Sequence, residues 1–196
     1  MRPHFPIRDN AINTRVSGYK IESMIKFLLG FVLGIGLFLL AGYFFATRGG
    51  LSMATKGGPL PMERSIAHQA LAASIGQSSG DQSPLPADET NLLAGAHLYL
   101  QNDCVICHGR LDQTAPDVAK RFYPHAPQLL PPGKGVTDDP VGTTHWVVKN
   151  GIRFSAMPAF DGKLTETELW QVSLLLRNAD KLPPPVQEAL RQPPAQ

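Results

Sequence analysis

The longest apolar stretch of the chain lies near its N-terminus, where no charged residue occurs from Phe27 to Thr47. A helix rises about 1.5 Å per residue, so about 20 apolar residues cross the ~30 Å hydrocarbon core of a membrane. A buried core helix normally keeps a polar stripe, which this stretch lacks. A cleaved signal peptide has a shorter apolar region of about 7–15 residues and then a small-x-small cleavage site. We therefore expect residues 27–47 to form an uncleaved transmembrane helix.

Basic residues are more frequent before this stretch than after it. Those that precede it are Arg2, Arg8, Arg15, Lys20 and Lys26, whereas Arg48, Lys56 and Arg64 follow it. Positively charged flanks stay in the cytoplasm. The pattern predicts that residues 1–26 are cytoplasmic and that the chain after Arg48 lies on the outer side. Met24, followed closely by Lys26, also resembles the start of a signal anchor and is an alternative start of the chain.

Two further segments have the apolar periodicity of helices. Residues 89–102 place leucines and alanines on one face, and a capping box at Thr165–Glu168 opens a second helix that ends before the prolines at 183–185. Residues 48–87 are expected to form a linker, with a short helix from Pro61 to about Ile75 and a flexible spacer over 76–87.

Composition excludes several classes of protein. The net charge is +2, only 17% of the residues are charged, and the chain has two cysteines. This charge is too low for a nucleic-acid binder with a broad basic face. Two cysteines cannot form a disulfide scaffold or a four-cysteine zinc site.

Both cysteines belong to one motif, which runs from Cys104 through Cys107 to His108. C-x-x-C-H is the attachment motif of a c-type haem. Two thiols one helical turn apart can each bond one vinyl group of the same porphyrin, and the adjacent histidine can then coordinate the iron. A thioredoxin-like C-x-x-C would follow a strand, and the segment before this one has a helical pattern. A zinc site would need another ligand, such as His125 or His145, and no paired spacing supports one.

Met157 is the candidate sixth ligand of the iron. It is the only methionine after the C-x-x-C-H motif, and it stands before Pro158 in a loop. A thioether is a soft ligand that favours reduced iron. Methionine is also common core filler, and His125 and His145 are rival ligands. His125 lies in the proline-rich stretch between Pro116 and Pro140, which we expect to line the haem edge as an irregular loop.

From about residue 88 to 182 the chain resembles a class I cytochrome c, in particular a membrane-anchored one with a single haem. The resemblance rests on Cys104, Cys107, His108, Gly109, Gly95, Tyr99, Met157, Pro158, Leu169 and Trp170. It implies an all-α fold of short helices around one covalent haem c. It implies that the first and last helices cross through a glycine and aromatic contact, matched by Gly95, Tyr99 and Trp170. It also implies Met157 as the distal iron ligand.

These observations predict five segments. They are a cytoplasmic segment (1–26), a transmembrane helix (27–47), a linker with a short helix (48–87), a haem domain (88–182) and a proline-rich tail (183–196). The haem would be held by Cys104, Cys107, His108 and Met157, with His108 and Met157 binding the iron. No pair of carboxylates or nucleophile with a base stands out as catalytic.

The function that we expect is electron transfer by a carrier that is not itself an enzyme. The haem domain would lie on the periplasmic face of the inner membrane and exchange electrons with redox proteins in or at that membrane, without nucleic acid or a small-molecule substrate. One alternative is a haem subunit fixed in a larger respiratory or dehydrogenase complex. Another is a haem catalyst or sensor whose sixth ligand is labile.

Overall fold

The computed structural model describes residues 10–50 and 53–192. The chain divides into two compact units, Met1–Ala54 and Thr55–Gln196. Arg2 and Arg8 of the predicted cytoplasmic flank lie outside the described residues, as do the last four residues of the predicted tail.

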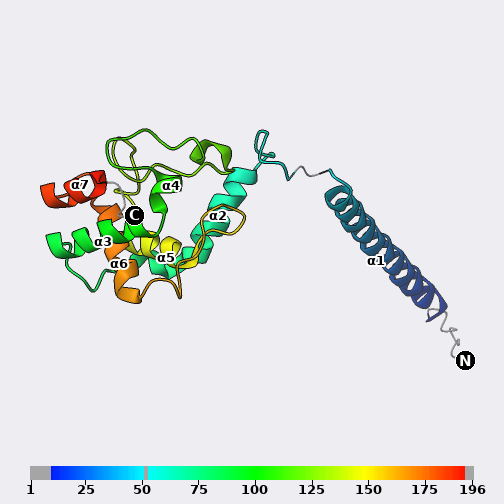
Figure 1. Ribbon diagram of the computed structural model, residues 1–196. Coiled ribbons are helices and arrows are strands. Elements are labelled where there is room, and N and C mark those ends of the chain that lie inside the picture. The colour runs from blue at the N-terminus through cyan, green and yellow to red at the C-terminus, as the bar shows by residue number, and fades with distance from the viewer. Residues whose placement is uncertain (1–9, 51–52, 193–196) are drawn as a thin grey trace, which may run out of the picture. The chain divides into compact units, whose positions relative to one another are not determined.

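The first unit contains one long helix, α1 (Asn10–Thr47), drawn in blue in Figure 1. Within Lys20–Thr47 the most apolar 18 residues have a mean hydropathy of 2.4, and none of them is buried. Large apolar side chains are exposed all around it, from Ile21 to Phe45. The helix is therefore long and apolar enough to cross a membrane, a requirement that a signal sequence near the N-terminus also meets.

The second unit is all-α, as the sequence predicts. Between residues 53 and 192 no strand forms, and the β-type pairing consists of an isolated bridge between Asp161 and Leu164. The helices are α2 (Glu63–Ile75), η1 (Gly76–Gly80), α3 (Glu89–Gln101), α4 (Cys104–His108), η2 (Ala119–Arg121), α5 (Val141–Asn150), α6 (Glu166–Arg177) and α7 (Pro184–Arg191).

The core of this unit is the crossing of α3 and α6, to which α5 and α7 are added on either side. Both central helices begin with a side-chain cap, and the one on α6 is the capping box that the sequence predicts. The Asp88 side chain accepts a hydrogen bond from the Asn91 backbone N–H at 2.9 Å, and Thr165 and Glu168 form the capping box. Gly95 lies where α3 meets the backbone of α6 at Gln171, so the absence of a side chain permits the close approach.

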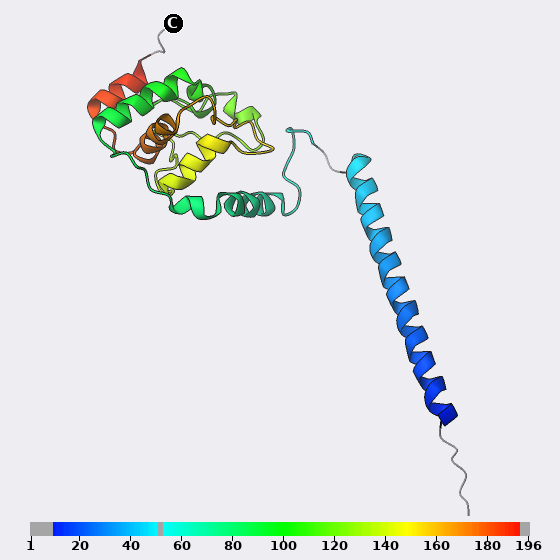
Figure 2. The same ribbon diagram turned by 90° about the horizontal axis from the view of Figure 1, so that it is seen from below.

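Helix α7 lies in the segment for which the sequence predicts a proline-rich tail. Val186 and Leu190, four residues apart, are completely buried, and α7 packs against α3 (Figure 2). Prolines occupy the N-cap and first turn of this helix, where a missing N–H costs nothing. The packed core therefore continues beyond residue 182 to Leu190.

The predicted spacer over 76–87 is also packed. Its first residues form η1, which lies against α5. A Cβ atom on Gly142 of α5 would collide with the carbonyl oxygens of Ser78 and Asp81. This close approach fixes η1 and the residue after it on the surface of α5, so the serines and glycines of this part do not make it a free linker.

Candidate functional site

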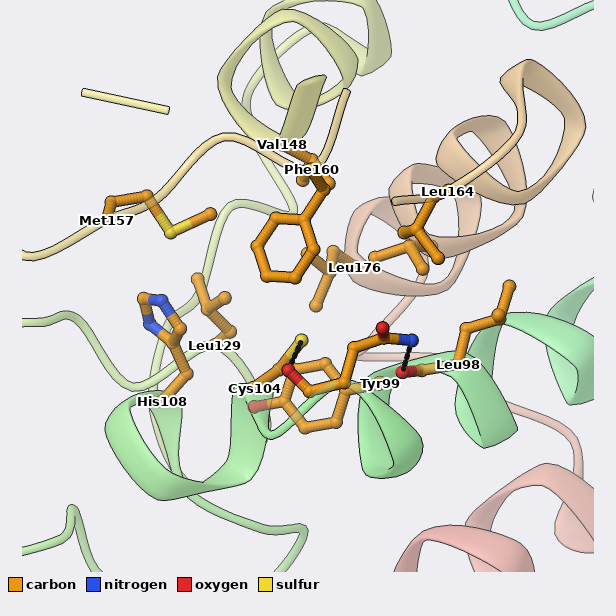
Figure 3. Close-up of a pocket in the computed structure, with 12 residues that line it drawn as sticks. Leu98, Tyr99, Cys104, His108, Leu129, Val148, Met157, Phe160, Leu164 and Leu176 are labelled. Carbon is orange, nitrogen blue, oxygen red and sulfur yellow. Dashed lines mark hydrogen bonds between the residues drawn. The ribbon is translucent and has the colours of Figure 1, made fainter. Parts of the chain in front are cut away.

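A pocket lined almost wholly by carbon lies between α3, α4, α5, α6 and the loop that carries Met157 (Figure 3). Its apolar wall comes from Leu98, Leu129, Val148, Phe160, Leu164, Val172 and Leu176. Cys104, His108 and Met157 line the same pocket. Three of the four residues that the sequence predicts for haem binding therefore meet at one place.

The short helix α4 presents the Cys104–His108 motif. Asp103 precedes it in the left-handed conformation (φ 60°), and Gly109 ends it with φ 80°. Both thiols are half-buried, and one turn of helix separates them. Burial raises the pKa of the Cys104 thiol to about 11, so at neutral pH this group is a protonated thiol rather than a thiolate.

The ring of His108 is oriented by the backbone. Its Nδ1 lies 2.7 Å from the carbonyl oxygen of Pro127. A carbonyl oxygen only accepts hydrogen bonds, so Nδ1 carries the proton and Nε2 keeps a free lone pair. Burial lowers the pKa of His108, which also favours the neutral ring. A neutral imidazole whose other nitrogen donates to a carbonyl is the usual arrangement of a metal-binding histidine.

Two further hydrogen bonds hold the backbone around His108. Tyr99 is fully buried on α3, and its hydroxyl donates to the carbonyl oxygen of Gly109 at 2.8 Å. The N–H of Leu129 donates to the carbonyl oxygen of His108 at 3.2 Å. The motif is thus tied both to α3 and to the irregular stretch 116–140, which the sequence predicts to lie at the haem.

A tight loop holds Met157. The Ile152 N–H donates to the Met157 carbonyl oxygen at 3.2 Å, and the Met157 N–H donates to Ser155 Oγ at 3.1 Å. Gly151 starts the loop with φ 67°, and any Cβ there would crowd Met157 O, 2.8 Å away. Figure 3 shows the Met157 side chain near the His108 ring. Met157 is half-buried against the core, in a loop rather than a helix.

The two rival histidines do not line this pocket. His125 is exposed, whereas His145 is buried on α5 with its ring stacked on Trp170 at a centroid distance of 3.8 Å. His145 Nε2 lies 3.0 Å from Glu166 Oε1 without a well-aligned hydrogen bond. Burial lowers the pKa of His145, although Glu166 acts in the opposite direction. Trp170 therefore packs on α5, and the partners of Gly95 on α6 are Gln171 and Leu175 instead.

Some groups that position the site cannot be predicted from residue type. The Pro127 acceptor is a backbone oxygen, which every residue type possesses. The same is true of the Gly109 oxygen that Tyr99 contacts. By contrast, the positive φ of Gly109 and Gly151 is a feature that glycine in a loop can indicate.

The residues present fit a haem. An apolar pocket suits the porphyrin ring, and an imidazole nitrogen and a thioether suit its iron. Cys104 supplies a thiol at the pocket for one vinyl group, and Cys107, which does not line the pocket, lies one turn further along α4. In the described part of the chain the unpartnered buried side-chain atoms, Thr144 Oγ1 and His145 Nε2, belong to residues that do not line this pocket. No group of three or more His, Cys, Asp or Glu side chains within the described residues is arranged to bind a metal such as zinc.

The comparison with protein families agrees with this geometry. Residues 90–174, which include the C-x-x-C-H motif and Met157, match the family described as cytochrome C oxidase, cbb3-type, subunit III. No curated protein and no solved structure matches the chain. The matched segment contains α3 to α5 and most of α6, the helices that surround the pocket. The match supports a c-type cytochrome domain in this part of the chain, and such a domain supports electron transfer by a haem protein.

Proposed function

We propose that this protein is a membrane-anchored electron carrier with one haem c, bound through Cys104 and Cys107 and ligated by His108 and Met157. Helix α1 would cross the inner membrane once, and the haem domain would lie on its periplasmic face. Its partners would be redox proteins in or at the same membrane. The protein would bind neither nucleic acid nor a small-molecule substrate.

One observation carries the proposal: His108 and Met157 line the same apolar pocket as Cys104, while His125 and His145 do not. His108 offers Nε2 because Nδ1 is engaged by Pro127. Met157 offers a thioether from a loop whose hydrogen bonds limit its movement. If His108 and Met157 both bind the iron, the protein itself would supply its remaining ligands, and a substrate could not reach the iron.

When bound, the haem supplies the one-electron exchange between ferric and ferrous iron. The contribution of this chain is burial, ligation and orientation. The apolar wall formed by residues such as Leu129, Phe160 and Leu176 excludes water. The hydrogen bonds from the His108 ring to Pro127 and from Tyr99 to the Gly109 carbonyl oxygen hold His108 and the backbone next to it in place. This part of the protein would therefore rearrange little when the charge of the iron changes.

The membrane part of the proposal is supported by α1, whose apolar length matches a bilayer, and by the larger number of basic residues before it. An anchor would keep the haem domain near membrane-bound donors and acceptors and so raise its effective concentration there.

Absorption spectroscopy of the purified full-length holoprotein tests the ligation. The oxidised protein should show the weak red band of thioether-ligated iron, and the reduced protein should not bind carbon monoxide at neutral pH. Met157→Ala should lose the band and bind carbon monoxide. Met53→Ala, at an exposed methionine, should behave like the wild type. Wild-type protein that binds carbon monoxide readily would instead support a catalyst or sensor with a labile sixth ligand.

The family match favours one second candidate. Its name describes a subunit of a terminal oxidase, so this chain could be a haem subunit fixed in a larger respiratory complex. Native electrophoresis of gently solubilised membranes, followed by haem staining, separates the two functions. A haem band found only at high mass supports the fixed subunit, and a band at the mass of the chain supports the carrier.

A further inference from the structure

The segment that follows α1 exposes an unusual number of large apolar side chains. Six are exposed in the described chain after Thr47, and four of these lie between residues 53 and 66. They are Met53 (86% exposed), Leu60 (40%), Met62 (73%) and Ile66 (59%). The whole remainder of the second unit exposes only Ile106 and Phe154 among its described residues.

Helix α2 has two apolar faces, and the protein covers one of them. Ile75 is buried and Leu71 is half-buried, so this face packs on the rest of the unit. Ile66, Ala70 and Ala73 follow the spacing of a second stripe on α2, the N-cap residue Met62 comes just before it, and all four residues are exposed. We call this stripe the outer face of α2.

Burial within the protein accounts for little of the stability of α2. Ile75 is its single buried residue, and its other contacts are with η1 and α5. An isolated helix of about 12–15 residues is marginal in water. A helix of 13 residues with so little of its surface covered gains stability if a second apolar environment covers the outer face.

The position of α2 in the chain indicates what that environment is. The apolar part of α1 ends at Thr47, and Met53 follows within six residues, a reach of at most about 20 Å. Met62 lies within reach of the same surface, at most about 50 Å of extended chain away. The charged residues between 48 and 66 are Arg48, Lys56, Arg64 and Glu63, so the segment is basic. Basic segments beside a membrane span are attracted to anionic lipid headgroups.

We propose that residues 53–66 and the outer face of α2 lie in the interfacial layer of the membrane that α1 spans. This proposal rests on the proposed anchor. Residues 53–66 and α2 would then bind the membrane surface in addition to connecting α1 to the haem domain. Met62 and Ile66 would insert among the lipids, and Leu71 and Ile75 would hold the haem domain beside them. The haem domain would then be kept close to the membrane surface instead of moving freely on a tether.

Spin-label accessibility in the full-length holoprotein tests the proposal. The protein is placed in vesicles of roughly seven parts phosphatidylcholine to three parts phosphatidylglycerol. Labels are attached at Met62→Cys and Ile66→Cys. His68→Cys is the matched control, because it is exposed but lies on a different side of α2. Collisions with oxygen, which concentrates in lipid, are compared with collisions with a water-soluble nickel chelate.

The ratio of oxygen to nickel collisions should be several-fold higher at positions 62 and 66 than at 68. Adding Lys56→Glu and Arg64→Glu should reduce that difference. A label at Phe38→Cys, an exposed position within α1, reports the anchor separately. Equal ratios at 66 and 68, with Phe38→Cys in lipid, would overturn the interfacial contact and leave the anchor intact. A label at position 38 that is accessible to the nickel chelate would overturn the anchor itself.

Discussion

The carbonyl oxygen of Gln171 on α6 occupies the position that a Cβ atom on Gly95 of α3 would need. The two central helices therefore touch backbone to backbone at this point. Around the contact lie Ala96, Tyr99 and Leu175, none of which is accessible to solvent. Since Tyr99 also holds the backbone at Gly109, the crossing of these helices determines where the C-x-x-C-H motif lies.

Gly95→Ala should destabilise the haem domain. Alanine favours a helix over glycine by about 1 kcal/mol, but here it would push α3 away from α6. Overpacking of this kind costs about 1–3 kcal/mol, so after the gain in helix propensity we expect a net loss of about 1 kcal/mol. Urea unfolding followed by tryptophan fluorescence measures it, because both tryptophans belong to the second unit. Gly80→Ala, in open space, is the control. Equal stability of the two variants would contradict the close contact.

Leu190→Ala should be as damaging as a substitution in the centre of the protein. Leu190 is completely buried on α7, and removing a buried leucine side chain costs about 2–5 kcal/mol. The control Glu188→Ala changes an exposed residue of the same helix and should have little effect. The same urea titration compares them. A Leu190→Ala variant as stable as Glu188→Ala would mean that the domain does end near residue 182.

The features that the sequence predicts well are local ones. Apolar spacing indicates α3 and α6, and the capping box indicates where α6 begins. The C-x-x-C-H motif indicates its cofactor without help from the fold. Helix α7 was missed because three prolines at 183–185 suggest a break, although Val186 and Leu190 have helical spacing. Whether that short stripe packs on α3 depends on the shape of a surface assembled from distant parts of the chain.

The candidate site likewise combines predictable and unpredictable parts. Residue type and motif suggest His108 and Met157 as candidate ligands, but the Pro127 oxygen that orients His108 is a backbone atom 19 residues away in the chain. The resemblance implies a contact of Gly95 with Trp170; in the structure the α6 atoms nearest to Gly95 belong to Gln171 and Leu175, and Trp170 stacks on His145. One residue along a helix is a rotation of about 100°, so a small error in register changes the partner.

The pH dependence of stability should change when His145 is replaced. Burial lowers the pKa of His145 from its ordinary value of 6.5. As the pH falls, His145 therefore becomes protonated in the unfolded chain before it does so in the folded protein. The contribution of neutral His145 to the free energy of unfolding is complete above about pH 6.5 and is lost as the pH falls below that value. Glu166 and Lys149 face the ring, and the pKa of Glu166 is held below its ordinary 4.5, outside this window.

His145→Phe keeps an aromatic ring against Trp170 without a proton to bind. Between about pH 7.5 and pH 5.5, the urea midpoint of the wild type should fall more than that of the variant. Parallel curves for the two proteins would show that His145 does not contribute to the pH dependence.

Loss of either thiol should impair covalent attachment of haem. Cys104 and Cys107 are the two cysteines of the chain, so no third thiol can take over the attachment when one of them is removed. Haem staining after denaturing electrophoresis should be weaker for Cys104→Ala and for Cys107→Ala, and absent for the double variant. Staining of the double variant at wild-type intensity would refute attachment through this motif.

Met157→His should keep the haem and lower its reduction potential. Imidazole stabilises ferric iron more than a thioether does, and axial ligands span a range of about 0.8 V in haem proteins. A decrease on the order of 0.2 V is expected. Redox titration of the full-length holoprotein measures it, with Met53→His as the control at an exposed methionine. The control should keep the wild-type potential. If Met157→His kept it as well, Met157 would not be a ligand of the iron, whatever its position in the pocket.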